Sequence, residues 1–475
     1  MEDTSSSKVT VEYHDPAGIF PLIQHDLASR LPLRNLNWKS RTRPLRRIEA
    51  LHLDFVPDSY ASTTPSVARS SEAPGLWPSK DNKSQSTPAV GPDSAQKERR
   101  HQIPGLRQTP YLKLFILRCD DKDTYKATAR QQVRDWMRIS GLAAQSSTAV
   151  NKLHDAFEWM IIHVVIPDTG AASEPRWRPD KKDPDELLER SQSKTKWTTK
   201  STSTVYDKLR ADFNPSTKVS LERVAQIRLQ KNVVPPQLLP KAPVASPYSE
   251  SPQEQENAWQ DLIGKFKILI LQSFDARVSQ YEDDIREREL QRSLPGWNFC
   301  TFFTLKEGLA RGFESAGLVE DALSIYEELS AGLESTTRDS SGPPTFLGDM
   351  SSLKRELEHL DESDGNSEYV KDVEGRVSHL LESPLDLAKK DYRGLIVSST
   401  ISLFDFQTYI FARQRALLYR LGNFVPAVLT QGIADTKTKS GQTDDDLVYV
   451  AEVCKKTAAF VTSNVRLLRT ELSTG

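Results

Sequence analysis

Few residues of this chain stand in a pattern that could do chemistry. His163 lies inside the apolar run 161–165, where its imidazole could act as a base or remain a hydrogen-bonded strand histidine. Asp120, Asp121 and Asp123 follow a predicted strand, which is where α/β folds place ligand-binding groups. Because no glycine-rich phosphate loop lies beside them, these carboxylates fit either a metal or nucleotide site or a solvated turn with a helix cap.

The cysteines and the short motifs favour neither a metal site nor an enzyme. Cys119, Cys300 and Cys454 are far apart and show no CxxC or Cys/His spacing, so we expect no disulfide framework, no zinc site and a reducing compartment. The signatures GxxxxGK[ST], GxGxxG, HExxH, GxSxG and the EF-hand loop are absent from the sequence. We therefore predict no enzyme, no cofactor, and no catalytic, cofactor-binding or metal residue.

A basic segment near the amino terminus is the most suggestive surface. Seven cations between positions 30 and 47 include no acidic residue among them: Arg30, Arg34, Lys39, Arg41, Arg43, Arg46 and Arg47. They alternate with Leu31, Leu33, Leu36 and Trp38. Such a segment could hold anionic lipid headgroups or an acidic partner, or it could pair with the chain's own carboxylates. The net charge of −2 argues against bulk nucleic-acid binding.

Length and composition predict about two or three domains for 475 residues, on a prior of ~150 residues each. The hydrophobic fraction of 37% and the mean hydropathy of −0.53 are low, which indicates polar inserts that cannot offset their ordering entropy. The sequence has no apolar run of 18 residues and starts with an acidic, polar stretch, so we expect neither a membrane span nor a secretory signal. A cytosolic or peripheral membrane protein fits these features.

The amino-terminal part is predicted to be an α/β domain over residues 1–57 and 105–235, with disordered inserts at 58–104 and 168–203 and a linker at 236–255. Strands are expected at 9–13, 48–55, 111–117 and 159–166, and a helix at 125–139. The last two strands and this helix form a βαβ unit, which predicts a parallel strand pair.

From residue 256 to 475 the apolar period becomes helical. A long helix toward Leu290, ended by Pro295, carries a stripe that is either core or a partner groove: Trp259, Leu262, Ile263, Phe266, Leu269, Ile270 and Phe274. The same two interpretations apply to six aromatic residues further on: Phe302, Phe303, Phe404, Phe406, Tyr409 and Phe411. Further helices are expected at 380–390, 404–421 and 447–472.

A helical hairpin is predicted over 297–333. Small and aromatic residues lie where two antiparallel helices would touch, at the spacing of tetratricopeptide-type hairpins: Leu309, Ala310, Phe313, Ala322 and Tyr326. Gly317 fits the turn between them. Gly422 and Ala427 repeat the interval between Gly317 and Ala322, so we expect a second hairpin at 403–435 and an irregular α-solenoid. Because the last helix carries apolar residues with no partner after it, we expect the natural chain to continue beyond Gly475.

Several segments resemble the large TRAPP II subunits of the trafficking protein particle complex subunit ten family, especially fungal members. They are 294–300 (LPGWNFC), 305–309, 320–323, 31–36 with 38–40, 273–275 with 277–278, and 403–406 with 411–414. Members of that family are much longer and carry β-sandwich modules after the helical region, which this sequence lacks. The resemblance implies a peripheral protein of the trans-Golgi and the cytoplasm. It implies partners among the small core subunits and the second large subunit of TRAPP II.

The resemblance also implies a function. It predicts a non-catalytic scaffold that supports nucleotide exchange on Rab-type GTPases, which it meets indirectly, and helps to tether vesicles. It gives the basic segment a task in contact with an anionic Golgi membrane or an acidic subunit, and it identifies no partner-binding residue and no nucleic-acid partner. Two alternatives stay open: a membrane-binding adaptor acting alone, or an α/β enzyme with a ligand near Asp120 to Asp123.

Overall fold

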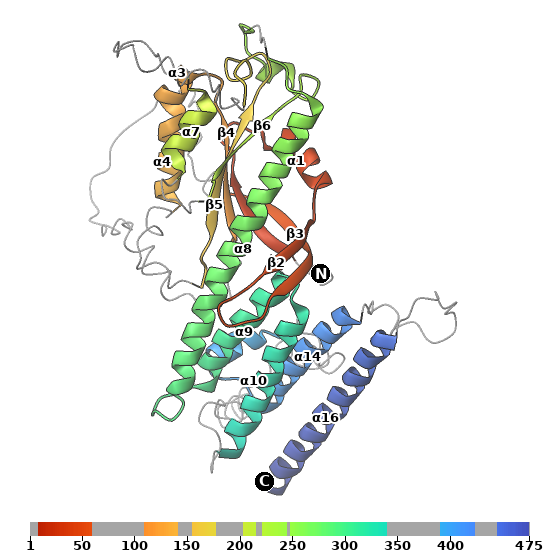
Figure 1. The fold of residues 1–475 in the computed structure, drawn as a ribbon. Coiled ribbons are helices and arrows are strands. Elements are labelled where there is room, and N and C mark those ends of the chain that lie inside the picture. Colours follow the sequence, from red (N-terminus) through yellow and green to blue (C-terminus); the bar gives the residue numbers. More distant parts are fainter. Residues whose placement is uncertain are drawn as a thin grey trace, which may run out of the picture.

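A computed structural model describes residues 8–58, 109–140, 154–176, 203–214, 221–244, 248–339, 390–422 and 444–474. It confirms the coarse prediction of a sheet-containing amino-terminal part followed by a helical part (Figure 1). The expected insert 58–104 lies outside the described residues from position 59 onward, and so do the expected helix 380–389 and the second half of the 403–435 hairpin. The insert 168–203 is wrong at 168–176, because these residues are ordered and bury Thr169, Ala171 and Arg176.

Six strands form one mixed sheet: β1 (Lys8–His14), β2 (Leu33–Trp38), β3 (Arg46–Pro57), β4 (Leu112–Arg118), β5 (Glu158–Val165) and β6 (Val224–Arg228). Their order is β2-β3-β1-β4-β5-β6, and all neighbours are parallel except β2, which runs antiparallel to β3 at one edge. The predicted parallel pair, β4 with β5, is confirmed. The five parallel strands have a doubly wound order, in which the direction of strand addition reverses between β1 and β4.

Helices cover the sheet on two sides (Figure 1). On one face, α1 (Phe20–Ser29) and α8 (Pro252–Leu290) share a core with the strands. On the other face lie α3 (Lys122–Thr124), a π-helical turn η2 (Tyr125–Ala129), α4 (Arg130–Ile139) and α7 (Val205–Phe213). The helix predicted at 125–139 is therefore confirmed, with its first turn widened.

Helix α8 joins the sheet to the helical part, because its apolar face contacts β2, β4, β5 and β6 and then α9. It begins inside the expected linker, where Ser251 caps it by accepting from the Glu254 N–H. Its predicted stripe is buried in the core, with Ile263 partly covered, so the partner-groove interpretation is wrong there. Of the six later aromatic residues, only Phe404 is exposed, at 43%, and the others are also core.

The helical hairpin is confirmed as α9 (Phe299–Ser315) and α10 (Val319–Asp339). Gly317 has φ +83° at the turn. The Leu318 N–H donates to the Phe313 carbonyl at 2.9 Å and the Gly317 N–H to the Glu314 carbonyl at 3.1 Å, the pair of hydrogen bonds that ends a helix at a left-handed glycine. Leu309, Ala310, Phe313, Ala322 and Tyr326 are all buried, as their spacing predicts.

The described residues after α10 contain the helices α13 (Tyr392–Val397), α14 (Leu403–Leu421) and α16 (Asp444–Thr474). Helix α14 packs on α10, and α16 packs on α14 with the Phe460 ring stacked 4.5 Å from that of Phe411. These contacts make a layered helical region, while a repeating solenoid of tetratricopeptide type remains a prediction. Among the described residues, no helix has both the length and the apolar content needed to cross a bilayer.

Candidate interaction surface

The chemically suggestive histidine is a structural one. His163 is fully buried in β5, its Nε2 lies 3.0 Å from the Cys119 carbonyl, and its Nδ1 lies 3.1 Å from the amide nitrogen of Gln226 on β6. Burial lowers its pKa to about 4, with a smaller contribution from Arg228. His163 is therefore neutral near pH 7 and bonded on both ring nitrogens, so the strand-histidine interpretation is the one that the structure supports.

The acidic residues after β4 form a turn and a helix cap. Asp121 accepts hydrogen bonds from the Asp123 and Thr124 N–H groups at 2.9 and 2.6 Å, and these backbone hydrogen bonds, the one from Thr124 first, lower its pKa. Asp120 pairs with Arg118 at 2.8 Å. The carboxylates of Asp120 and Asp121 are thus occupied by the fold, and no cluster of His, Cys, Asp or Glu among the described residues could hold a metal ion.

In the described part of the chain no catalytic arrangement is seen at the buried cysteines or at the point between β1 and β4 where the strand order reverses. Burial raises the pKa of the Cys119 thiol to about 12 and that of Cys300 to about 11, so neither is an activated nucleophile. At the end of β1, the place where doubly wound folds bind ligands, Asp15 accepts from the Phe20 N–H at 2.6 Å and so caps α1.

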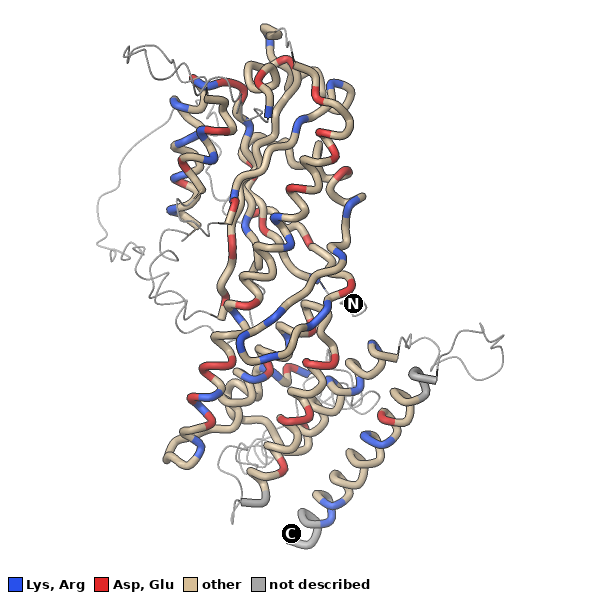
Figure 2. The backbone as a smooth tube through the Cα atoms, in the orientation of Figure 1, with Lys and Arg blue, Asp and Glu red and all other residues tan. Residues whose placement is uncertain are grey.

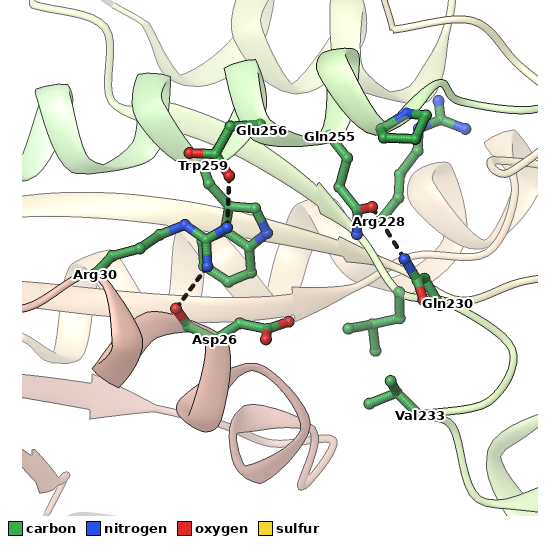
Figure 3. Close-up of a pocket in the computed structure, with 10 residues that line it drawn as sticks. Asp26, Arg30, Arg228, Gln230, Val233, Gln255, Glu256 and Trp259 are labelled. Atoms are coloured by element: carbon green, nitrogen blue, oxygen red, sulfur yellow. Dashed lines mark hydrogen bonds and ion pairs between the residues drawn. The ribbon is translucent and has the colours of Figure 1, made fainter.

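A pocket lies between α1, the end of β6 and the start of α8 (Figure 3). One ion pair lies in it: Arg30 binds Glu256 at 2.7 Å, donates to the Asp26 backbone carbonyl at 2.8 Å and lies over the Trp259 ring. Gln230 donates to Gln255 at 3.1 Å across the opening. The pocket therefore joins three elements and presents no converging set of free titratable groups.

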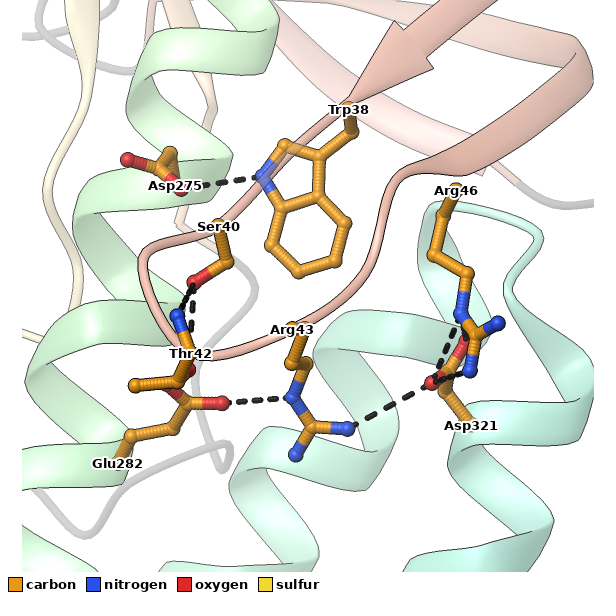
Figure 4. Close-up of polar contacts among 8 residues, drawn as sticks. All are labelled: Trp38, Ser40, Thr42, Arg43, Arg46, Asp275, Glu282 and Asp321. Atoms are coloured by element: carbon orange, nitrogen blue, oxygen red, sulfur yellow. Dashed lines mark hydrogen bonds and ion pairs between the residues drawn. The ribbon is translucent and has the colours of Figure 1, made fainter.

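The basic segment divides into an inner and an outer group. The inner group is Arg30, Arg43 and Arg46, which bind carboxylates far away in sequence. Arg43 lies 2.6 Å from Glu282 on α8, 3.5 Å from Asp321 on α10 and 4.6 Å from the Phe313 ring centre (Figure 4). Arg46 binds the same Asp321 at 3.0 Å. For these three residues the pairing interpretation is correct.

Around these arginines, the β2–β3 loop is tied to the helices by neutral groups as well. The indole N–H of Trp38 donates to Asp275 at 3.1 Å, and Thr42 donates to Glu282 (Figure 4). The Trp38 ring packs against Phe274 and Phe313 at 4.9 and 5.9 Å between centres. We call Trp38, Thr42, Arg43 and Arg46 with Asp275, Glu282 and Asp321 the sheet–helix clamp.

The outer group is Arg34, Lys39, Arg41 and Arg47, all exposed on β2, the following loop and the start of β3. Figure 2 shows basic positions along this edge of the sheet. Arg47 donates to Asn35 at 3.1 Å, and none of the four has an ion pair within the described part of the chain. Leu45 is 62% exposed in the same loop. The outer group is thus the part of the basic segment that can meet a partner.

From the sheet–helix clamp we predict a measurable loss of stability when the Asp321 carboxylate is removed. Asp321 is 6% exposed and holds both Arg43 and Arg46. We expect Asp321→Ala to lower the free energy of unfolding by about 1.5–3 kcal/mol, the usual contribution of hydrogen bonds to charged groups, as measured by urea denaturation. Asp283→Ala is the control: Asp283 is 63% exposed and pairs only with Arg286, so about 0–1 kcal/mol is expected. Equal effects of the two variants would contradict the clamp.

His163 predicts a loss of stability on acidification. The folded state keeps the imidazole neutral down to about pH 4, whereas the unfolded chain takes up the proton near pH 6.5. Stability is therefore present above pH 6.5 and falls as the pH drops from 6.5 toward 4, by roughly 2–3 kcal/mol between pH 7.5 and 4.5. Urea titrations of the parent and of His163→Gln at both pH values test this. Between pH 7.5 and 4.5 the free energy of unfolding of the variant should fall by roughly 2–3 kcal/mol less than that of the parent. Equal falls in parent and variant would rule out His163 as the cause.

Comparison with known proteins finds one family. A family model described as trafficking protein particle complex subunit 10-like, N-terminal, matches residues 90–179 and 242–292. Trafficking protein particle complex subunit 10 of Dictyostelium discoideum is 26% identical over 421 residues, which are 87% of this chain and 22% of that protein. The Mus musculus protein of the same name is 26% identical over 315 residues, 65% of this chain and 19% of its own length.

A plant relative is more similar over a shorter stretch. The trafficking protein particle complex II-specific subunit 130 homolog of Arabidopsis thaliana is 33% identical over 165 residues, 35% of this chain and 11% of that protein. The chain spans about a fifth of the length of the Dictyostelium and mouse relatives. The two segments matched by the family model contain β4 to β5 and α8, which lie against each other in the fold.

Proposed function

We propose, from the premise that this chain is related to the trafficking protein particle complex subunit 10 family, that it serves as a non-catalytic scaffold in such a complex. More finely, we assign it to TRAPP II, with small core subunits and the second large subunit as its partners. In this assembly it supports nucleotide exchange on a Rab-type GTPase without contacting the nucleotide, and it helps to tether vesicles at the trans-Golgi from the cytoplasmic side. We also propose that the helices of its carboxy-terminal part, residues 256–475, form an irregular α-solenoid.

The observation that best supports a scaffold is the single apolar core that runs from the sheet into the helical hairpin. Arg277 of α8 shows how the two parts are locked together: it donates to the carbonyls of Ala156 at 2.6 Å and Pro110 at 2.8 Å, just before β5 and β4, and lies 3.8 Å from the Tyr111 ring centre. A rigid joint of this kind holds two surfaces in a constant relation, which a subunit that positions others requires.

The outer group supplies a surface for an acidic partner. Four exposed cations on one edge of the sheet attract carboxylates of a neighbouring subunit or the anionic headgroups of a Golgi membrane by the same Coulomb interaction. Arg34 lies on the edge strand β2, and Lys39 and Arg41 lie in the loop that follows it. Contact with a subunit is our first assignment, and membrane contact by the chain acting alone is the second candidate, favoured by the exposed Leu45 beside the charges.

Affinity purification from the chain's own cells tests the assignment. The tagged parent should recover small core subunits and the second large subunit, and recovery of neither would overturn the scaffold proposal. The triple variant Arg34→Glu, Lys39→Glu, Arg41→Glu should lose at least one of these partners. The matched control is Lys126→Glu, Arg134→Glu, Arg138→Glu, which reverses one exposed cation on η2 and two on α4 and should keep all partners.

Liposome flotation separates the two candidates. If the outer group binds anionic vesicles directly, flotation of the parent should weaken as the Debye length falls from ~10 Å at 0.1 M salt to ~3 Å at 1 M, and the triple variant should not float. Absence of flotation at low salt, together with loss of a subunit in the purification, favours the subunit contact.

A further inference from the structure

Helix α16 has two apolar faces on opposite sides, and the described part of the chain covers only one of them. The covered face packs on α14 through Phe460 and the buried Asn464, and Lys456 binds Glu327 of α10 at 2.9 Å. The helix lies at the outside of the helical region, with α14 on one side of it (Figure 1). Among the described residues its position in the fold is therefore set by one face, and the other is open to a different contact.

The uncovered face is a continuous apolar row. Ala451, Cys454, Ala458, Val461 and Val465 are all exposed and alternate by three and four residues, the spacing that keeps one side of a helix facing a partner helix. Val461 is 53% and Val465 41% exposed, and Val450 beside them is 37% exposed. From 451 to 465 the row extends for about 21 Å at 1.5 Å per residue. The small residues at its start let a partner backbone approach closely.

One edge of this row is basic. Lys455, Arg466 and Arg469 are exposed along it. The only carboxylate in the sequence between Val448 and Arg469 is Glu452, which lies toward the covered face and pairs with Lys455 at 3.3 Å while leaving that lysine side chain 77% exposed. The opposite edge carries Val450 and Thr457. An occupant that lies along the row therefore meets positive charge on one side and neutral groups on the other.

We propose that this face of α16 docks an amphipathic helix that carries acidic side chains along one edge. A second copy of the chain fits poorly, because an antiparallel pair would bring the basic edges together and a parallel pair would place each basic edge against Val450 and Thr457, with no carboxylate. A membrane fits poorly as well, because the described row contains no leucine or aromatic residue to insert. This docking is separate from the proposed function and does not use the outer group.

Cys454 provides the probe, since it lies within the row and is the exposed cysteine, whereas Cys119 and Cys300 are buried. The rate of its alkylation by a small maleimide is measured on the full chain with two synthetic four-heptad helices. Both have leucine at the seam positions, and they carry either glutamate or lysine at the flanking positions. We expect the glutamate helix to slow alkylation about tenfold at a concentration well above its dissociation constant, and the lysine helix to have little effect.

Two variants sharpen the result. Lys455→Glu, Arg466→Glu, Arg469→Glu should reverse the preference between the two helices. Ala458→Glu should abolish protection, and because Ala458 is exposed, the packing of Phe460 on Phe411 should survive in both variants, as checked by unchanged unfolding curves. Equal protection by the two helices, or protection by neither, would overturn the proposal. Protection that grows with the concentration of the chain alone, or that needs anionic vesicles, would assign the face to a second copy or to a membrane instead.

Discussion

Glu307→Ala is expected to lower the free energy of unfolding by about 3–5 kcal/mol, because it breaks a buried ion pair from one side. The Glu307 side chain is 2% exposed and binds Arg393 at 3.2 Å. It also accepts hydrogen bonds from Tyr326 on α10 at 3.3 Å and from Tyr409 on α14. Removal of the carboxylate takes one partner from Arg393 and the acceptor from two phenol groups, at the place where α9, α10 and α14 meet.

Urea denaturation with the conservative and control variants checks this. Glu307→Gln retains a hydrogen-bond acceptor but not the charge. Its free energy of unfolding should therefore lie between those of the parent and of Glu307→Ala. The control is Glu328→Ala on the same helix pair: Glu328 is 57% exposed and pairs with Lys306, so about 0–1 kcal/mol is expected. A loss for Glu307→Ala as small as that of Glu328→Ala would mean that the network does not stabilise the junction.

The local parts of the fold were predictable from sequence because their signals are local. Alternation and length located β1, β3, β4 and β5, and the close contacts of the hairpin followed from small residues and from Gly317. Helices α7 and α1 also carry local sequence signals, although they were not among the predicted elements. The capping box of α7 joins Thr204 and Asp207 through reciprocal side-chain hydrogen bonds, and α1 places Phe20, Ile23 and Leu27 on one buried face.

Strand β2 was missed for a physical reason. Its buried residues Leu33 and Leu36 are three apart rather than two, because Asn35 between them has φ +57° and shifts the alternation. In the sequence this stretch is a basic segment that lacks the alternation of apolar and polar residues typical of a strand. Strand β6 is short, and its apolar run is interrupted by Gln226, whose partner is His163 on the neighbouring strand. Both strands depend on contacts that a local pattern does not contain.

Pairing of the basic segment with the chain's own carboxylates was one of the open interpretations, but the individual partners could not be predicted, because they lie about 220 to 280 residues away along the chain. Arg43 and Arg46 meet Asp321, and Trp38 meets Asp275. The segments that carry the family resemblance include both sides of the clamp: Trp38 in 38–40, Asp275 in 273–275 and Asp321 in 320–323. The resemblance thus follows the joint between the sheet and the helices, and the proposed scaffold role depends on that joint.

Gly308→Ala tests the other side of this joint, the packing of α9 against α8. A Cβ at position 308 would lie 2.7 Å from the Tyr281 ring and its hydroxyl. The ring has little freedom to move, since Tyr281 is 5% exposed and its ring centre lies 4.3 Å from that of His154. Overpacking of such a site reduces stability by about 1–3 kcal/mol or more, while alanine gains roughly 1 kcal/mol over glycine in helix propensity. We expect a net loss of about 1–2 kcal/mol, from the upper part of that range less the gain in propensity.

The sign of the effect separates this explanation from a general intolerance of α9 to substitution. Gly312 lies one turn further along the same helix, and a Cβ there would meet nothing within 4 Å. Gly312→Ala should therefore stabilise by roughly 0.5–1 kcal/mol through propensity alone. If Tyr281 is the obstacle, adding Tyr281→Leu to Gly308→Ala should recover part of the loss in a double-mutant cycle, because the smaller side chain makes room for the methyl group. Strictly additive losses would show that the helices approach each other differently from the arrangement described here.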